Sequence, residues 1–205
     1  MTTKNAGKKH ILLLYHRTMD RLWGITLVLG LVLVALWWFG GAFTDLLHPG
    51  NAALVLAAAG IALAVGVFAF LARRMGYVQA HADYFVLATP FFRLKTSYRR
   101  VRSIRTTEFF RLFDVDNLKW SEESYLKPFV GESTVVVGLT DYPVSPRVIK
   151  LFFPNYILSP KGTEYVLLVP EWMGLSVELD SRYNEYRQRN RRRQEKQGFQ
   201  RGSYR

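Results

Sequence analysis

The chain has 205 residues, with 28 Lys and Arg against 16 Asp and Glu, and it contains no cysteine. The lack of cysteine excludes a disulfide framework, a thiolate nucleophile and Cys-ligated zinc or iron–sulfur sites. The charges are segregated, because residues 22–71 carry one formal charge, Asp45, and the rest of the chain carries all the others. Such segregation is typical of a membrane protein with a soluble part.

Two apolar runs predict a transmembrane helical hairpin over residues 22–74. Residues 22–43 and 52–71 contain no Asp, Glu, Lys or Arg. At about 1.5 Å rise per residue they make roughly 33 Å and 30 Å of helix, enough to cross a ~30 Å hydrocarbon core. Pro49-Gly50 between them is a turn signal. The first run is too long for the core of a signal peptide and a second run follows it, so we expect it to be retained as an anchor.

The basic residues around the two runs predict their orientation. Residues 1–21 form a basic segment with five Lys and Arg against one acid, Arg73 and Arg74 follow the second run, and the loop between the runs has no Lys or Arg. The positive-inside rule therefore predicts a multi-pass inner-membrane protein with both termini in the cytoplasm. Residues 8–21 are both basic and apolar, which fits either an amphipathic segment in the membrane interface or a cytoplasmic extension of the first helix.

Small residues recur at four-residue spacing in both runs. They are Ala58, Ala62 and Gly66, then Gly60 and Ala64 beside them, and Thr26 with Gly30 in the first run. Small faces let membrane helices approach closely. These residues serve either to pack the two helices on each other or to leave a face for another membrane subunit.

Short β-prone segments separated by turn residues follow the hairpin. The predicted strands are 76–80, 84–89, 91–98, 101–109, 133–140, 148–153 and 165–169. Short connections predict an antiparallel sheet, in which residues 133–140 are the best candidate for a central strand. The strands do not alternate with helices along the chain, which argues against a parallel α/β fold. Residues 110–132 predict a long loop with a short helical turn near 121–125.

The period of the pattern changes after Pro170. Apolar residues at helical spacing then form one stripe: Trp172, Leu175, Leu179, Tyr183 and Tyr186. An amphipathic helix must cover another element, and we expect this one to close the open end of a small barrel. The predicted cytoplasmic domain is therefore 75–190, and residues 191–205 are expected to form a basic disordered tail.

Residues 83–87 and 98–104 resemble a strand pair of the bacterial PH-like (pleckstrin-homology-like) membrane proteins that carry an N-terminal two-helix transmembrane hairpin. In that pattern an aromatic or apolar residue precedes a polar pair, an Ile or Val, and a second Ile or Val three residues on, as in Tyr98-Arg99-Arg100-Val101-Arg102-Ser103-Ile104. The resemblance implies an α+β membrane protein in which the hairpin is followed by a small antiparallel PH-like β-barrel capped by a C-terminal helix. It does not carry over a phosphoinositide site, because the first hairpin turn, 81–83, has no Lys or Arg.

Two basic clusters are candidate binding surfaces. The first lies on the predicted strands and comprises Arg93, Lys95, Arg99, Arg100, Arg102 and Arg105. One interpretation is that this cluster faces anionic lipid, where the attraction to the membrane surface is worth about 1 kcal/mol for each Lys or Arg. The other is that it is an ordinary solvated strand face. The second lies in residues 182–205, which hold nine basic residues and two acidic ones, and it includes Arg187, Arg189, Arg191, Arg192, Arg193 and Lys196. Anionic lipid, nucleic acid and an acidic protein compete as partners of this tail, and no nucleic-acid fold signature favours the second.

No catalytic, metal-binding or cofactor motif is present in the sequence. We therefore expect no catalytic residue, metal, cofactor or small-molecule substrate. The sequence favours a membrane-anchored PH-like interaction or scaffolding module on the cytoplasmic face, with anionic lipid head groups as its first partner and other membrane proteins as further ones. The alternative is a small accessory subunit of an integral membrane protein complex, in which the PH-like part serves for packing. A PH-like fold hosts many unrelated functions, so the fold does not decide between these hypotheses.

Overall fold

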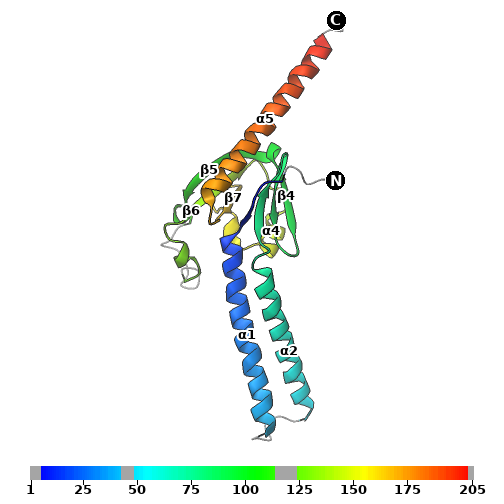
Figure 1. Cartoon of the computed structure of the whole chain (residues 1–205), viewed down its shortest axis with the longest axis vertical. Coiled ribbons are helices and arrows are strands. Elements are labelled where there is room, and N and C mark those ends of the chain that lie inside the picture. The colour runs from blue at the N-terminus through cyan, green and yellow to red at the C-terminus, as the bar shows by residue number, and fades with distance from the viewer. Residues whose placement is uncertain (1–5, 43–48, 114–123, 203–205) are drawn as a thin grey trace. The chain divides into compact units, whose positions relative to one another are not determined.

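The structure is a computed structural model that describes residues 6–42, 49–113 and 124–202, with side chains for 6–40, 52–113 and 124–195 (Figure 1). The chain divides into two compact units. We call residues 15–76 the hairpin unit, and residues 1–14 together with 77–205 the β unit. In sequence, the hairpin unit is therefore inserted into the β unit between Leu14 and Tyr77.

The hairpin unit consists of two long antiparallel helices, α1 (Leu13–Ala42) and α2 (Pro49–Ala72), as Figure 1 shows. Both are long and apolar enough to span a membrane, which confirms the two predicted apolar helices. Only 6% of the apolar span of α1 and 17% of that of α2 is buried. The core helix of a soluble protein would bury most of its apolar side chains, whereas Val28 and Ile61 are 60% and 66% exposed. The described protein thus leaves the apolar surface of this hairpin uncovered.

Two glycines lie in the seam between α1 and α2. A methyl group at Gly30 would lie 2.7 Å from the side chain of Leu63, and one at Gly66 would lie 3.1 Å from Thr26 Oγ1. Gly66 on α2 and the Thr26 and Gly30 pair on α1 thus allow the two helices to pack closely, as small residues do in membrane helix packing. Ala62 is half-buried and Ala58 is exposed, because a four-residue spacing drifts around a helix of 3.6 residues per turn.

The β unit contains two antiparallel sheets, which confirms the predicted strand orientation. The first sheet has the order β1 (Lys9–Ile11), β2 (Tyr77–Ala80), β3 (Tyr84–Ala88) and β4 (Arg93–Ser97). The second has the order β5 (Val101–Glu108), β6 (Ser133–Leu139) and β7 (Glu164–Leu167). The predicted central strand is confirmed, since β6 lies between β5 and β7. Within residues 6–42, 49–113 and 124–202 the sheets are two separate ladders and not a closed barrel.

Strand β1 was not predicted from the sequence. Its residues pair with β2 in the register Lys9↔Gln79, His10↔Val78 and Ile11↔Tyr77. The backbone N–H of Gly7 extends this pairing by donating to the carbonyl of Ala80 at 2.8 Å. Residues 8–21 therefore divide into a short strand and, from Leu13, the N-terminal extension of α1 that was one of the two sequence alternatives.

The C-terminal helix α5 (Trp172–Gly202) packs on β2, β5 and β6. Leu175 and Leu179 are fully buried, whereas Val177 between them and Met173 before them are exposed, so the predicted apolar stripe is confirmed. The stripe continues in Tyr183 and Tyr186, whose rings lie 6.5 Å and 6.0 Å from the buried ring of Tyr98. Figure 1 shows α5 running along the sheets and beyond them. This helix thus covers part of the core that both sheets share.

The predicted strand at 148–153 is wrong, because these residues form the helix α4 (Pro146–Phe152). Ser145 precedes the helix and Pro146 occupies its first turn, where the fixed φ and missing N–H of proline favour a helix start. Ile149 is fully buried and Leu151 is exposed. These two β-prone residues therefore lie on opposite faces of the same helix, one toward the core and one toward solvent. Local helix-start signals therefore outweighed β propensity.

Two segments differ in extent from expectation. α5 remains helical to Gly202 and passes through the expected boundary at residue 190, since Arg, Gln, Lys and Glu are good helix formers and Arg191 pairs with Glu195 at 3.2 Å one turn on.

The predicted 110–132 loop begins with η2 (Phe109–Arg111) and ends with a helical turn at 124–126 and η4 (Lys127–Phe129). Leu126 and Phe129 are buried in the core there. Residues 114–123 of that loop lie outside the described residues.

Candidate functional site

The six residues of the first predicted basic cluster are all exposed, but they lie on both sheets. Arg93 and Lys95 are in β4, Arg99 and Arg100 in η1 (Tyr98–Arg100), and Arg102 and Arg105 in β5. Three of them have partners within the fold. Arg105 binds Glu164 through two bonds of 2.8 and 2.9 Å, Arg100 donates to the carbonyl of Tyr142 at 2.9 Å, and Lys95 lies 5.8 Å from the Tyr84 ring. The run of cations in sequence is therefore not one strand face.

The basic residues of the C-terminal helix also divide by role. Arg189 donates to the carbonyl of Ala82 and pairs with Asp83 at 3.1 Å, so it fastens α5 to the turn between β2 and β3. Arg187 lies over the ring of Tyr183 at 5.6 Å. Arg192 and Arg193 are exposed on the helix, and the side chain of Lys196 lies outside the described residues.

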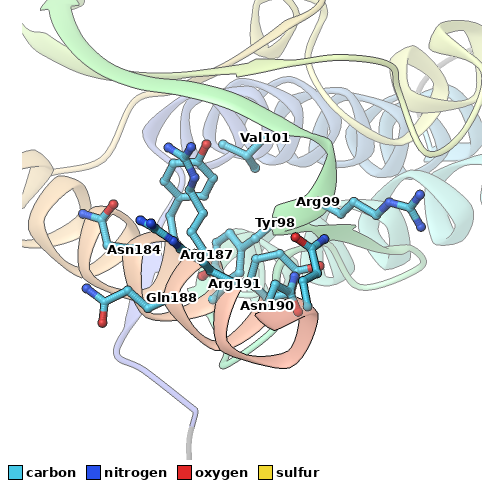
Figure 2. A pocket seen from close by; sticks show the side chains of 11 residues that line it. Tyr98, Arg99, Val101, Asn184, Arg187, Gln188, Asn190 and Arg191 are labelled. Atoms are coloured by element: carbon cyan, nitrogen blue, oxygen red, sulfur yellow. The ribbon is translucent and has the colours of Figure 1, made fainter. Parts of the chain in front are cut away.

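A groove of about 640 Å³ between α5 and the η1–β5 segment joins the two basic clusters. Figure 2 shows Arg187, Gln188 and Arg191 on α5, with Tyr98, Arg99 and Val101 on the opposite side. We call it the α5 groove, and its lining is Tyr98, Arg99, Val101, Tyr183, Asn184, Tyr186, Arg187, Gln188, Asn190, Arg191 and Gln194. Three arginines and no Asp, Glu or His line it. Arg191 pairs with Glu195 beside the groove at 3.2 Å, so Arg99 and Arg187 supply most of its positive charge.

Local structure sets both walls of the α5 groove. In η1, the backbone N–H of Arg99 donates to the hydroxyl of Ser97 at 3.3 Å, and this cap tightens the turn between β4 and β5. The turn buries Tyr98 to 1% exposure and leaves Arg99 exposed. On α5, residues at spacings of three and four share one face, which places Arg187 and Arg191 in line with Tyr183. The groove is therefore formed where the apolar stripe of α5 ends and its basic face begins.

The chemistry of the lining suits the binding of an anion. The Tyr98 side chain is a neutral phenol at physiological pH, and burial raises its pKa further above the usual value. Guanidinium groups stay charged and present planar donors that match phosphate and carboxylate oxygens in pairs. Four side-chain amides add neutral donors and acceptors: Asn184, Gln188, Asn190 and Gln194. The lining holds no pair of groups arranged for proton transfer.

A second groove of about 610 Å³ lies at the β5–β6 edge and has a mixed lining. It contains Arg102 and Lys161, but also Glu164, which Arg105 already neutralises. Lys161 donates to the carbonyl of Arg111 at 2.9 Å, which partly satisfies its ammonium. Among the described residues no group of three or more His, Asp or Glu side chains is placed to hold a metal ion. The α5 groove is thus the better candidate site.

The α5 groove was not predicted as a site, although all its arginines were singled out in sequence. Arg99 and Arg187 belong to two clusters far apart in the chain, and only the packing of α5 on β5 brings them together. A usable signal was present in Tyr183 and Tyr186, which are half-buried beside Tyr98, since the apolar stripe to which they belong sets the face of α5 that lies next to η1. Comparison of the chain with protein-family models, curated proteins and solved structures gives no match in any of the three.

Proposed function

We propose that this chain is a membrane-anchored, non-catalytic interaction module that binds anionic groups in the α5 groove on the cytoplasmic face. The observation that carries the proposal is the groove itself, with three arginines and no acidic residue in its lining. The finer architecture that we propose for the β unit is PH-like. Its support is a four-stranded and a three-stranded antiparallel sheet followed by a C-terminal helix, the arrangement that the sequence resemblance implies.

The uncovered apolar surface of α1 and α2 supports the membrane anchor. Each helix has the length that a bilayer requires, and exposed large apolar side chains along both would be costly in water. The pairing of Ile11 with Tyr77 adds a topological argument, because it holds the two ends of the hairpin unit at neighbouring strand positions. Both ends of the hairpin then lie on one side of the membrane.

The charge at the ends of the hairpin supports a cytoplasmic location of the β unit. Asp20 is the acidic residue there, and it pairs with Arg73 at 3.3 Å and with His16 at 2.9 Å. Arg17, Arg21 and Arg74 remain exposed and have no ion pair within the described residues. This excess of cations at the ends that join β1 and β2 is the pattern of a cytoplasmic boundary.

The ligand class follows from the guanidinium groups. Phosphate is the anion whose geometry they match best, and it is offered both by lipid head groups and by soluble phosphorylated molecules. The exposed position of Arg99, Arg187 and Arg191 leaves them accessible to either source. Binding of this kind weakens as salt screens the charges.

Calorimetric titration of the full chain in neutral-lipid nanodiscs with pyrophosphate tests the proposal. Replacing Arg99, Arg187 and Arg191 by Gln should weaken binding at least ~10-fold, equal to about 1.4 kcal/mol. The matched control replaces Arg93, Arg102 and Arg147 by Gln, which removes the same charge outside the groove and should leave binding nearly unchanged. Equal loss in both variants would show nonspecific attraction and contradict the proposal. Nanodiscs with phosphatidylglycerol distinguish the two sources, since competition with pyrophosphate indicates that lipid head groups reach the groove.

One observation favours the second candidate function, an accessory subunit of an integral membrane complex. Ala58, Gly60 and Ala64 are exposed on α2, and a methyl group at Gly60 would have no neighbour within 4 Å. This small-residue face lies outside the seam with α1 and is suited to close approach of another helix. Native mass spectrometry after mild detergent extraction separates the two functions. A stoichiometric complex that Gly60→Leu disrupts favours the subunit, and a lone species favours the module.

A further inference from the structure

The two most exposed large apolar side chains in the described part of the β unit are Leu151, at 76%, and Phe91, at 70%. They come from separate elements, α4 and the turn between β3 and β4. The Phe92 and Phe152 rings join these elements, since they stack with centroids 4.8 Å apart and planes at 10°. We call Phe91, Phe92, Leu151 and Phe152 the aromatic patch. It is a surface and not part of the α5 groove, whose lining contains none of these residues.

The fold holds the aromatic patch in place. The backbone N–H of Thr89 donates to the carbonyl of Phe92 at 2.8 Å, and the Thr89 hydroxyl accepts from the N–H of Phe92 at 3.2 Å. Pro90 occupies the second position of this tight turn, which its fixed φ favours, and Phe91 stands at the tip. On α4, Ile149 is fully buried and holds the helix, so Leu151 is directed outward. Both apolar side chains are therefore presented by well-fixed backbone.

Basic residues flank the patch in sequence. Arg93 follows Phe92 directly, Lys150 precedes Leu151, and Arg147 lies one helical turn before Leu151. All three are exposed, and none of their side chains has a hydrogen bond or ion pair within the described residues. α4 contains no acidic residue. An apolar centre with an unpaired cationic rim is complementary to the interface of an anionic bilayer, where apolar side chains enter the acyl boundary and cations meet the head groups.

We infer that the aromatic patch inserts into the interfacial layer of an anionic membrane, with Phe91 and Leu151 as the inserted side chains and Arg93, Arg147 and Lys150 on the head groups. Insertion of this surface would set the orientation of the β unit on the bilayer. Neither the membrane-spanning helices nor the α5 groove determines that orientation. The inference rests on the membrane anchor of the proposed function. A chain tethered by two spans keeps the patch close to a bilayer at all times, so weak insertion is sufficient.

The lack of native cysteine allows a direct test with single-cysteine variants of the full chain. Phe91→Cys and Leu151→Cys, each carrying an environment-sensitive fluorophore, are placed in nanodiscs that contain phosphatidylglycerol. Quenching by nitroxide-bearing lipid should be several-fold stronger than for Val177→Cys, a control on α5 that is 69% exposed. Quenching by acrylamide should show the opposite order. Replacing Arg93, Arg147 and Lys150 by Gln in the Phe91→Cys chain should reduce the lipid quenching to its level in phosphatidylcholine nanodiscs.

A fourth label separates this inference from the proposed anchor. Val28→Cys, on an exposed face of α1, should be quenched by the lipid nitroxide if the hairpin spans the nanodisc. If Val28 is quenched while positions 91 and 151 behave like 177, the hairpin spans the nanodisc but the patch does not insert, and the inference is overturned. If Val28 is not quenched, the anchor itself fails. Quenching at position 91 that survives the triple Gln replacement would contradict the role given to the cationic rim.

Discussion

Ile11 and Tyr77 face each other in the antiparallel register of β1 and β2, although both apolar helices lie between them in sequence. The hairpin unit is therefore an insertion within the first strand pair of the β unit and not an attachment in front of it. The described backbone leaves this sheet after β1 and rejoins it at β2. A protein that is cut at the end of the second apolar helix consequently loses a strand of its own sheet.

We predict that residues 77–205 alone are much less stable than residues 6–14 joined to 77–205 by a short Gly-Ser linker. The first protein lacks β1 and the side chains of Leu12 and Leu14, which are each 2% exposed. Burying a leucine side chain contributes about 1.5–3 kcal/mol, so the difference should be about 3–6 kcal/mol. Urea denaturation of both proteins measures it, and equal midpoints would show that β1 does not stabilise the sheet.

The apolar stripe of α5 gives a second prediction. Leu179→Asp places a carboxylate at a fully buried position, which should cost several kcal/mol of the free energy of unfolding. Val177→Asp is the matched control on the exposed face, with an expected effect within about 0.5 kcal/mol. Thermal denaturation of the linked β unit compares the two. An unchanged melting temperature for Leu179→Asp would mean that this face does not pack on the sheets.

The histidine in the turn between β2 and β3 gives a prediction about pH. Desolvation lowers the pKa of His81 below its usual 6.5, and the charges of Lys95 and Arg182 lower it further. The folded state thus favours the neutral ring, so stability is constant above about pH 6.5 and falls as the pH drops from there to the folded pKa. The ring signals of His81 in an NMR titration should have a midpoint below 6.5, and Lys95→Gln should raise it. A titration midpoint above 6.5 in the unmodified chain would contradict the lowered pKa of His81.

Much of the fold was predictable because the deciding signals are local. Alternation of Leu94 and Thr96 with Arg93 and Lys95 defines β4, and the spacing of Leu175 and Leu179 defines the buried face of α5. These patterns depend on residues close in sequence. The central position of β6 was also predictable, since a run of β-branched residues without charges needs neighbours on both sides.

The rest depends on pairing across long stretches of sequence. β1 has three residues, too few for a period, and its partner lies beyond both apolar helices. The α5 groove requires Arg99 and Arg187 to meet, which follows only from the docking of α5. The aromatic patch does not follow from the sequence, because the β-prone residues 148–153 predict a strand, and a strand would place Lys150 and Leu151 on opposite faces. In the helix, Leu151 shares a face with Arg147.

The basic segment 182–205, which contributes Arg187 and Arg191 to the α5 groove, is also predicted to bind anionic bilayers by charge alone. A peptide of residues 182–205 carries nine basic and two acidic residues. Its binding to vesicles should rise with anionic lipid and collapse as salt shortens the Debye length from about 10 Å at 0.1 M to about 3 Å at 1 M. Replacing Arg191, Arg192 and Arg193 by Gln should remove at most about 3 kcal/mol, at ~1 kcal/mol each. Tight binding to RNA with no response to anionic vesicles would support the nucleic-acid alternative instead.

The most direct test of the whole account is the topology of the hairpin in intact cells. The α5 groove and the aromatic patch act as proposed only if the β unit lies on the cytoplasmic face. Because the chain has no cysteine, single variants Gly50→Cys and Gly198→Cys report each side separately. We predict that a membrane-impermeant thiol reagent labels Gly50→Cys in intact cells and labels Gly198→Cys only after lysis. Labelling of Gly198→Cys in intact cells, with Gly50→Cys protected, would contradict the account.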